Sequence, residues 1–124
     1  MRADELRARV LSLLSEIWAA ADRPDRAFEA ATVAARLLSD SSDPEVRGLV
    51  LVAEGMARWA RLDLAGAADG YERTIDAVGL DPARRAGMYA SVRLNLVRHL
   101  AGDVRRAVES GFEVVDRLGA AHIW

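Results

Sequence analysis

The chain contains no cysteine and no lysine, and it has only three prolines and few aromatic residues. Without cysteine it can form neither a disulfide nor a thiolate metal site. All 17 of its basic residues are arginine, which together with the abundant alanine fits high-GC bacterial coding. A net charge of −2 gives no general attraction to nucleic acid or to an anionic membrane.

Apolar runs long enough to span a membrane without a charge are also missing. Residues 2–5 are mostly charged, and no apolar region of a signal peptide follows them. The sequence contains no run of alternating apolar and polar residues bounded by turn residues, so no strand is predicted. A length of 124 residues with 52% hydrophobic and 29% charged residues is ordinary for one globular domain. We therefore expect a soluble, cytoplasmic, all-α protein.

What the sequence does contain is a turn used three times, at residues 22–27, 62–67 and 102–107. Each copy follows an apolar helical stretch, opens with a helix-start signal and reaches an alanine. Those alanines, Ala27, Ala67 and Ala107, are separated by 40 residues each time. A fixed period of this length is typical of a helical repeat array.

Helical periodicity and capping signals predict six helices. Apolar residues recur at three- and four-residue steps over residues 4–21, and small residues line one face of the next helix. Aspartate followed by proline, at residues 43–44 and 81–82, starts the third and fifth helices, and Gly79 ends the fourth. The helices form three antiparallel hairpins at about residues 4–38, 44–78 and 82–118.

Residues 120–124 follow a helix-ending glycine and are apolar. We expect Ile123 and Trp124 to start a seventh helix, because a terminal repeat normally carries a polar outer face and this end has none. On this interpretation the chain is a segment of a longer array.

The hairpins resemble tetratricopeptide repeats. In that family a small residue in the first helix is followed by a turn, an early alanine in the second helix, an aromatic residue four positions later and a small residue after it. The small position reads Ser15, Gly55 and Asn95, the aromatic position Ala31, Tyr71 and Gly111, and the last position Ala34, Thr74 and Val114. Only the middle repeat keeps the aromatic residue, and the period is longer than usual.

The resemblance implies a right-handed superhelix that acts as a scaffold for protein or peptide partners. In overall texture the chain is similar to the helical repeat regions of bacterial signal-transduction regulators, such as LuxR/MalT-type or SARP-type transcription factors. If it belongs to such a regulator, its DNA contact lies elsewhere in the longer protein.

Stacked hairpins leave a concave surface lined by the first helix of each pair. The 40-residue period places on it Arg9, Ser12, Glu16 and Ala19, then Leu49, Val52, Met56 and Trp59, then Tyr89, Val92, Leu96 and His99. The second and third rows are apolar and contain a methionine and aromatic residues, which is typical of an interaction surface. An apolar stripe at helical spacing is equally typical of a core, and Leu49 and Val52 are the residues most open to that reading.

We expect an apolar, helical partner element to bind this surface, with three polar side chains setting its position. The expected partner-binding residues are Leu49, Val52, Met56, Trp59, Tyr89 and Leu96, with Arg58, Arg93 and His99 as the polar set. Tetratricopeptide modules that hold a carboxyl terminus use a Lys, Asn and Arg set. This chain lacks that set, so we do not expect it to bind such a tail.

Two other functions stay open: a homodimer made through Ile123 and Trp124, and the sensing of a small apolar effector between helices. We expect no enzymatic activity, cofactor or metal. The two histidines lie on different elements, and no nucleophile with a base, carboxylate pair or phosphate loop is present. The arginine pairs at 84–85 and 105–106 form no basic stripe, so direct nucleic-acid binding is not expected.

Overall fold

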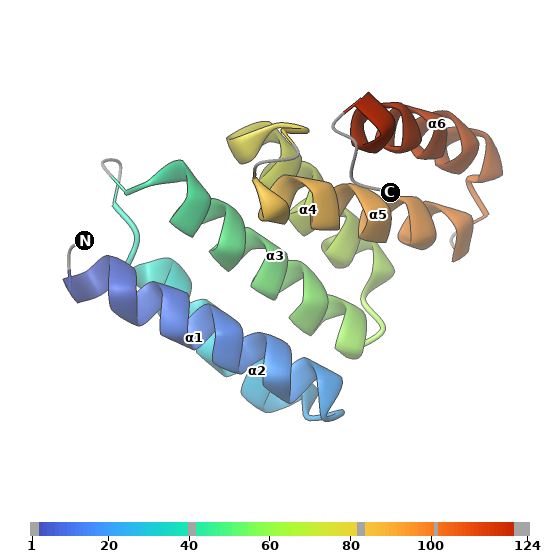
Figure 1. Cartoon of the computed structure of the whole chain (residues 1–124). Coiled ribbons are helices and arrows are strands. Elements are labelled where there is room, and N and C mark those ends of the chain that lie inside the picture. The colour runs from blue at the N-terminus through green and yellow to red at the C-terminus, as the bar shows by residue number, and fades with distance from the viewer. Residues whose placement is uncertain (1–2, 40–41, 82–83, 101, 121–124) are drawn as a thin grey trace.

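The computed structural model describes residues 3–39, 42–81, 84–100 and 102–120, and these residues form six α-helices and no strand (Figure 1). The prediction of an all-α protein is therefore confirmed. The helices are α1 (Ala3–Ala20), α2 (Pro24–Arg36), α3 (Pro44–Ala60), α4 (Leu64–Val78), α5 (Arg85–Leu100) and α6 (Val104–Ala120). The expected seventh helix, with Ile123 and Trp124, lies outside the described residues.

The three turns predicted from the repeat have the same backbone geometry. Asp22, Leu62 and Gly102 have φ values of 59°, 63° and 87°, and they occupy the same place 40 residues apart. After each one, a backbone N–H bonds back five residues, from Arg23 to Trp18 and from Asp63 to Arg58, and likewise from 103 to 98, at 2.8 to 2.9 Å. This bond across a left-handed residue is the Schellman ending of a helix, and it reverses the chain at each turn.

Three of the predicted helix starts are made by aspartate caps. An Asp43 carboxylate oxygen accepts the N–H of Glu45 at 2.8 Å, and Asp63 accepts that of Gly66 at 2.9 Å. The longest of these bonds is at α6, where Asp103 accepts the N–H of Arg106 at 3.3 Å. These bonds satisfy amide groups that have no partner within the helix. The start of α5 differs from the prediction: the Arg84 N–H first closes a turn on the Asp81 carbonyl at 2.8 Å, so the helix begins at Arg85.

Consecutive helices pack through small residues. Between α3 and α4, Tyr71 is fully buried with its ring against Gly55, where an added Cβ would lie 2.7 Å from the ring. Between α1 and α2, the Ser15 hydroxyl donates to the Ala27 carbonyl at 2.6 Å. Between α5 and α6 the order is reversed: the larger residue, Asn95, lies on the first helix and faces Gly111 on the second. The small position of the repeat therefore lies where α1 meets α2, where α3 meets α4 and where α5 meets α6. We call this line of contact the seam.

We call α1–α2, α3–α4 and α5–α6 the first, second and third pairs. Besides the contacts within pairs, α3 packs on both helices of the first pair and α5 packs on both helices of the second pair. Two core clusters fill these junctions, one around Val46 and Val50 and the other around Tyr71, Ala90 and Leu94. Among the described residues, the first pair makes no backbone-level contact with the third.

The burial of α1 differs from the prediction in one respect. Ser12, expected on the concave surface, is buried, and its hydroxyl donates to the Ala8 carbonyl at 2.8 Å. The buried face of α1 consists of small residues, Ala8, Ser12 and Ser15, because α2 and α3 approach it closely. Five of the larger apolar residues of α1 are exposed as a consequence: Leu6, Val10, Leu13, Leu14 and Ile17. Leu11 and Trp18 are partly buried.

Candidate functional site: a groove across α1, α3 and α5

A continuous groove runs across α1, α3 and α5. It consists of two hollows of about 520 and 430 Å³ that share Ala20 and Met56. The first is lined by Leu13, Glu16, Ile17, Ala20, Leu49, Val52, Met56, Arg85, Ala86 and Tyr89. The second is lined by Ala19, Ala20, Asp22, Met56, Trp59, Ala60, Leu62, Tyr71 and Arg93.

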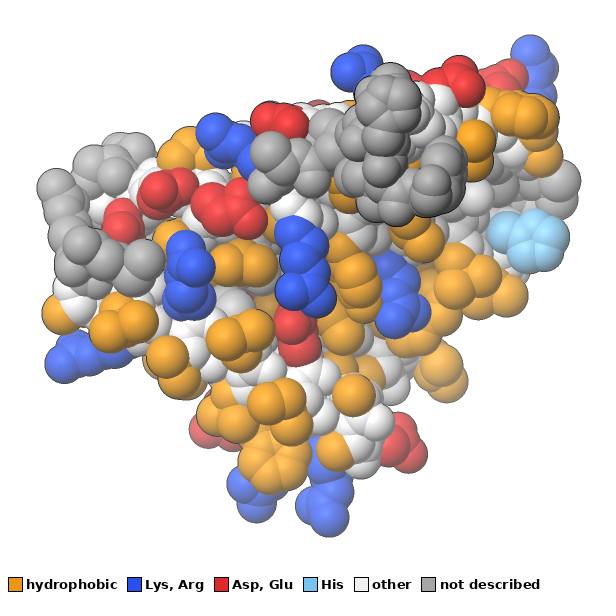
Figure 2. Space-filling view, viewed as in Figure 1, with side chains coloured by type: hydrophobic (Ala, Val, Ile, Leu, Met, Phe, Trp, Pro, Cys, Tyr) orange, Lys and Arg blue, Asp and Glu red, His pale blue; other side chains and the backbone are white. Residues whose placement is uncertain are grey.

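The groove is mainly apolar, and its charged groups are few. Figure 2 shows hydrophobic side chains gathered over the face on which α1, α3 and α5 lie in Figure 1, interrupted by single arginine and acidic side chains. Leu13 and Ile17 on the α1 wall are at least half exposed. Such a surface offers apolar area to a partner with a small number of polar contacts to fix its orientation.

Arg93 is held in the groove by two aromatic rings. Its Nε donates to the Tyr89 hydroxyl at 2.9 Å, and its guanidinium lies 5.2 Å from the Tyr89 ring centre and 6.0 Å from that of Trp59. The Tyr89 hydroxyl in turn donates to the Met56 sulfur at 3.5 Å. Arginine and aromatic residues fixed in this way are typical anchors of protein interfaces, because little side-chain entropy is left to lose on binding.

Two ionisable groups of the groove are shifted by burial. Burial raises the pKa of Glu16 above that of a free glutamate, and the nearby positive charge of Arg85 partly opposes the rise. Burial also raises the pKa of the Tyr71 hydroxyl, with Tyr89 adding to the effect, and this oxygen has no hydrogen-bond partner among the described residues. Both groups are thus partly withdrawn from water, and a polar contact made to such a group is stronger than one made at an exposed surface.

The structure brings together six of the nine predicted partner-binding residues. Leu49, Val52, Met56, Trp59, Tyr89 and Arg93 all line the groove. Val52 is almost fully buried in the core cluster, and Leu49 packs against that cluster, so for these two residues the core interpretation holds.

The other three predicted residues lie elsewhere. Arg58 bonds Asp63 at 3.2 Å and lies over the Phe28 ring of α2. Leu96 and His99 line a separate hollow of about 610 Å³ between α5 and α6. We call this the α5–α6 hollow, and it is lined by Val92, Asn95, Leu96, His99, Val108, Gly111, Phe112 and Val115. Ile123 and Trp124, predicted for self-association, lie outside the described residues.

The α1 wall of the groove was predicted only in part. Glu16 and Ala19, expected on the concave surface, line the groove, whereas Leu13, Ile17 and Ala20 were not expected there. Leu13 and Ile17 belong to the apolar stripe of the first helix, whose recurrence is plain in the sequence. Counting back 40 residues from the apolar rows of α3 and α5 leads to mainly polar positions of α1, and not to its apolar stripe. The signal that could have identified the missed residues is the row of small side chains in the first helix. These small side chains face α2, and the apolar stripe does not.

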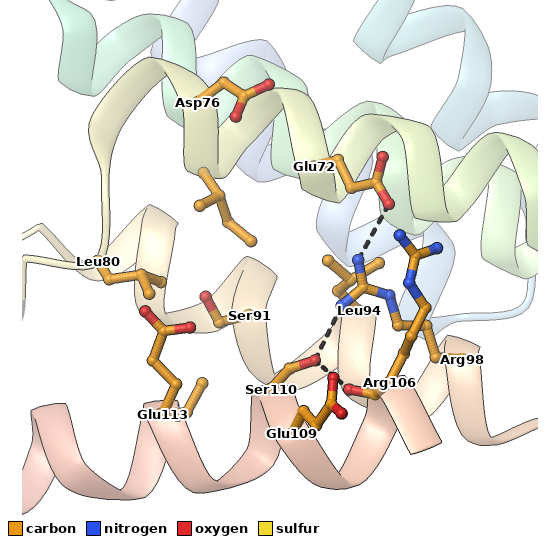
Figure 3. Close-up of a pocket in the computed structure, with 12 residues that line it drawn as sticks. Glu72, Asp76, Leu80, Ser91, Leu94, Arg98, Arg106, Glu109, Ser110 and Glu113 are labelled. Carbon is orange, nitrogen blue, oxygen red and sulfur yellow. Dashed lines mark hydrogen bonds and ion pairs between the residues drawn. The ribbon is translucent and has the colours of Figure 1, made fainter. Parts of the chain in front are cut away.

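A fourth hollow, of about 510 Å³, lies between α4 and the third pair (Figure 3). Arg98 crosses it: its guanidinium contacts Glu72 of α4 at 3.1 Å and donates to the Ser110 hydroxyl of α6 at 2.8 Å. These bonds attach α6 to the rest of the molecule. Within the described ranges, no group of histidine, aspartate and glutamate side chains is arranged to hold a metal ion, here or elsewhere.

None of the helices that the structure describes has the length and apolar character needed to cross a membrane. Comparisons of the chain with protein-family models, with curated proteins and with solved structures return no match.

Proposed function

We propose that this chain is a tetratricopeptide-like module of three antiparallel hairpins in a right-handed superhelix, and that it binds a protein or peptide partner in the α1–α3–α5 groove. The observation that carries the proposal is the position of Trp59, Tyr89 and Arg93, which stand together on an apolar floor. The proposal that the module serves a bacterial transcriptional or signal-transduction regulator rests on the sequence resemblance.

The partner that fits this groove is an amphipathic helix. Two adjoining hollows, which share Ala20 and Met56, offer places for apolar side chains that lie on one face of a helix. Arg93 and Glu16 offer one group of each charge to the polar edge of such a helix. Burial of a large apolar anchor contributes about 1.5–3 kcal/mol before the entropic costs of association.

The test is a displayed library of amphipathic helical peptides, from which binders are selected on the folded protein. We expect Trp59→Ala to weaken the selected peptides tenfold or more, because it removes both an anchor and the platform under Arg93. Dissociation constants measured by fluorescence anisotropy give the comparison.

Trp18→Ala is the matched control, since Trp18 is also half-buried and also carries an arginine over its ring, but lies outside the groove. Equal losses from both substitutions, or no loss from Trp59→Ala, would contradict the proposed site. A library that yields no binder would contradict the proposed function itself.

A further inference from the structure

The internal repeat shows how one pair covers the next. In α5, Ala86, Ala90, Leu94 and Val97 lie in the core cluster that also contains Val52, Ala67 and Tyr71 of the second pair. In α3, the residues 40 positions earlier are Val46, Val50, Glu54 and Ala57. Val46 and Val50 form a cluster with Ala8 and Ala34 of the first pair, Ala57 is fully buried, and Glu54 is partly buried. We call these positions the covering stripe, because they place each new helix on the preceding pair.

Helix α1 carries the same stripe, and nothing among the described residues covers it. The residues 40 positions before those of α3 are Leu6, Val10, Leu14 and Ile17. Val10 is 55% exposed, whereas Val50 and Ala90 at the equivalent positions are 0% exposed. All four α1 residues are larger than alanine and apolar. At three of its four positions, the stripe of α1 is thus an exposed copy of a surface that is buried twice within the molecule.

The opposite end of the molecule presents the complementary surface. Val92 in the α5–α6 hollow is 53% exposed, whereas Ser12 and Val52 at the equivalent positions of the first and second pairs are each 2% exposed. On α6, Phe112 is 69% exposed, and Val108 and Val115 are exposed beside it. The equivalents of Val108 and Val115 in the second pair, Ala68 and Ile75, pack in the cluster that α5 completes.

We propose that α1 of a second copy of this chain covers the α5–α6 hollow, so that molecules associate head to tail. The contact would repeat an interface that the chain already forms twice, between a covering stripe and the preceding pair. The sizes also correspond: the stripe of α1 has larger side chains than that of α5, and the hollow has Gly111 where the second pair has Tyr71. Because the chain itself carries both halves of the interface, a second copy is favoured over another occupant.

A contact of this kind is heterologous, because two different surfaces of the chain meet. Each added molecule therefore leaves one stripe and one hollow free, and the assembly grows without a fixed size unless it closes into a ring. The stripe and the hollow lie largely outside the groove, with Ile17 the one residue that the stripe and the groove share. The inference does not depend on the proposed function.

The experiment uses two charged substitutions, one on each surface, and light scattering over a concentration series. We expect the wild-type mass to rise with concentration past that of a dimer. Val10→Arg should remain monomeric with an intact hollow, and Phe112→Arg should remain monomeric with an intact stripe. An equimolar mixture of the two variants should reach twice the mass of one chain and stop there, since the only intact pair of surfaces joins one variant to the other.

The control is Val33→Arg on α2, an exposed apolar position whose equivalent in the second pair is already Arg73. It should associate as the wild type does, and circular dichroism should show all variants equally helical. A wild-type chain that stays monomeric at millimolar concentration would overturn the proposal. So would a mass that saturates at a dimer, a mixture that stays monomeric, or loss of association in the Val33→Arg variant.

Discussion

A close contact in the core is that between Gly55 and the ring of Tyr71, where a methyl group would lie 2.7 Å from a ring carbon. Gly55→Ala should destabilise the protein, because the ring is fully buried and cannot move aside freely. Overpacking of this kind costs about 1–3 kcal/mol, against the roughly 1 kcal/mol that alanine gains over glycine in a helix. The free energy of unfolding in urea measures the difference.

Gly111→Ala is the control, because it makes the same exchange on α6. An added Cβ there would lie 3.2 Å from the amide nitrogen of Asn95, a side chain with more freedom to adjust. We expect its stability to be unchanged or higher. If Gly55→Ala is no less stable than Gly111→Ala, the seam between α3 and α4 is not as tightly packed as described.

The sequence identified this seam only in part. The repeat pattern singles out Ser15, Gly55 and Asn95 as one position, and the structure places Gly55 against Tyr71 and Asn95 against Gly111. The repeat pattern could not show that the side-chain oxygen of Asn95 would be buried without a partner among the described residues. That outcome depends on the distance between α5 and α6, which no local pattern sets.

At the scale of the elements, the turn after each odd-numbered helix requires a left-handed residue. Glycine occupies this position only at Gly102, and Leu62 adopts φ 63° at a cost of about 1–2 kcal/mol. Leu62→Gly should therefore stabilise the protein by up to about 1 kcal/mol, after the larger entropy loss of glycine is subtracted. Leu62 is among the most exposed apolar residues, so little buried area is lost.

The reverse substitution, Gly102→Leu, should destabilise the protein by a similar amount, and thermal unfolding followed by circular dichroism measures both changes. A lower melting temperature for Leu62→Gly would show that the leucine side chain contributes more than its backbone strain costs.

Six helices could be predicted because periodicity and capping are local properties. The apolar stripe of α1 was also plain, but periodicity states that a stripe exists and not which surface covers it. Within the molecule, α1 meets its neighbours through Ala8, Ser12 and Ser15, whose small side chains allow close approach. The environment of the stripe is decided by packing between helices far apart in the sequence. This is why Leu13 and Ile17 were not expected in the groove, whereas Glu16 and Ala19 were correctly expected there.

At the scale of the whole molecule, the second pair has neighbours on both sides and the outer pairs on one side only. In a stack with nearest-neighbour contacts, local opening is easiest at the ends. We expect the amide hydrogens of α3 to exchange most slowly and those of α6 most rapidly, since Val114 is the single buried residue among its described side chains.

Native-state hydrogen exchange on the Phe112→Arg variant measures this gradient without interference from association. Uniform protection along the chain would contradict it and would indicate that the three pairs open as one unit.

The groove itself has a mechanical property that follows from this arrangement. Its walls, α1 and α5, are joined through α3, with no described backbone-level contact between them. The width of the groove is therefore set by the angles at which α1 and α5 pack on α3. A small rotation at either of these contacts moves the walls by more than it moves any residue of the floor. Bending of the stack, and not rearrangement of side chains, is the motion by which this surface would adjust to what it binds.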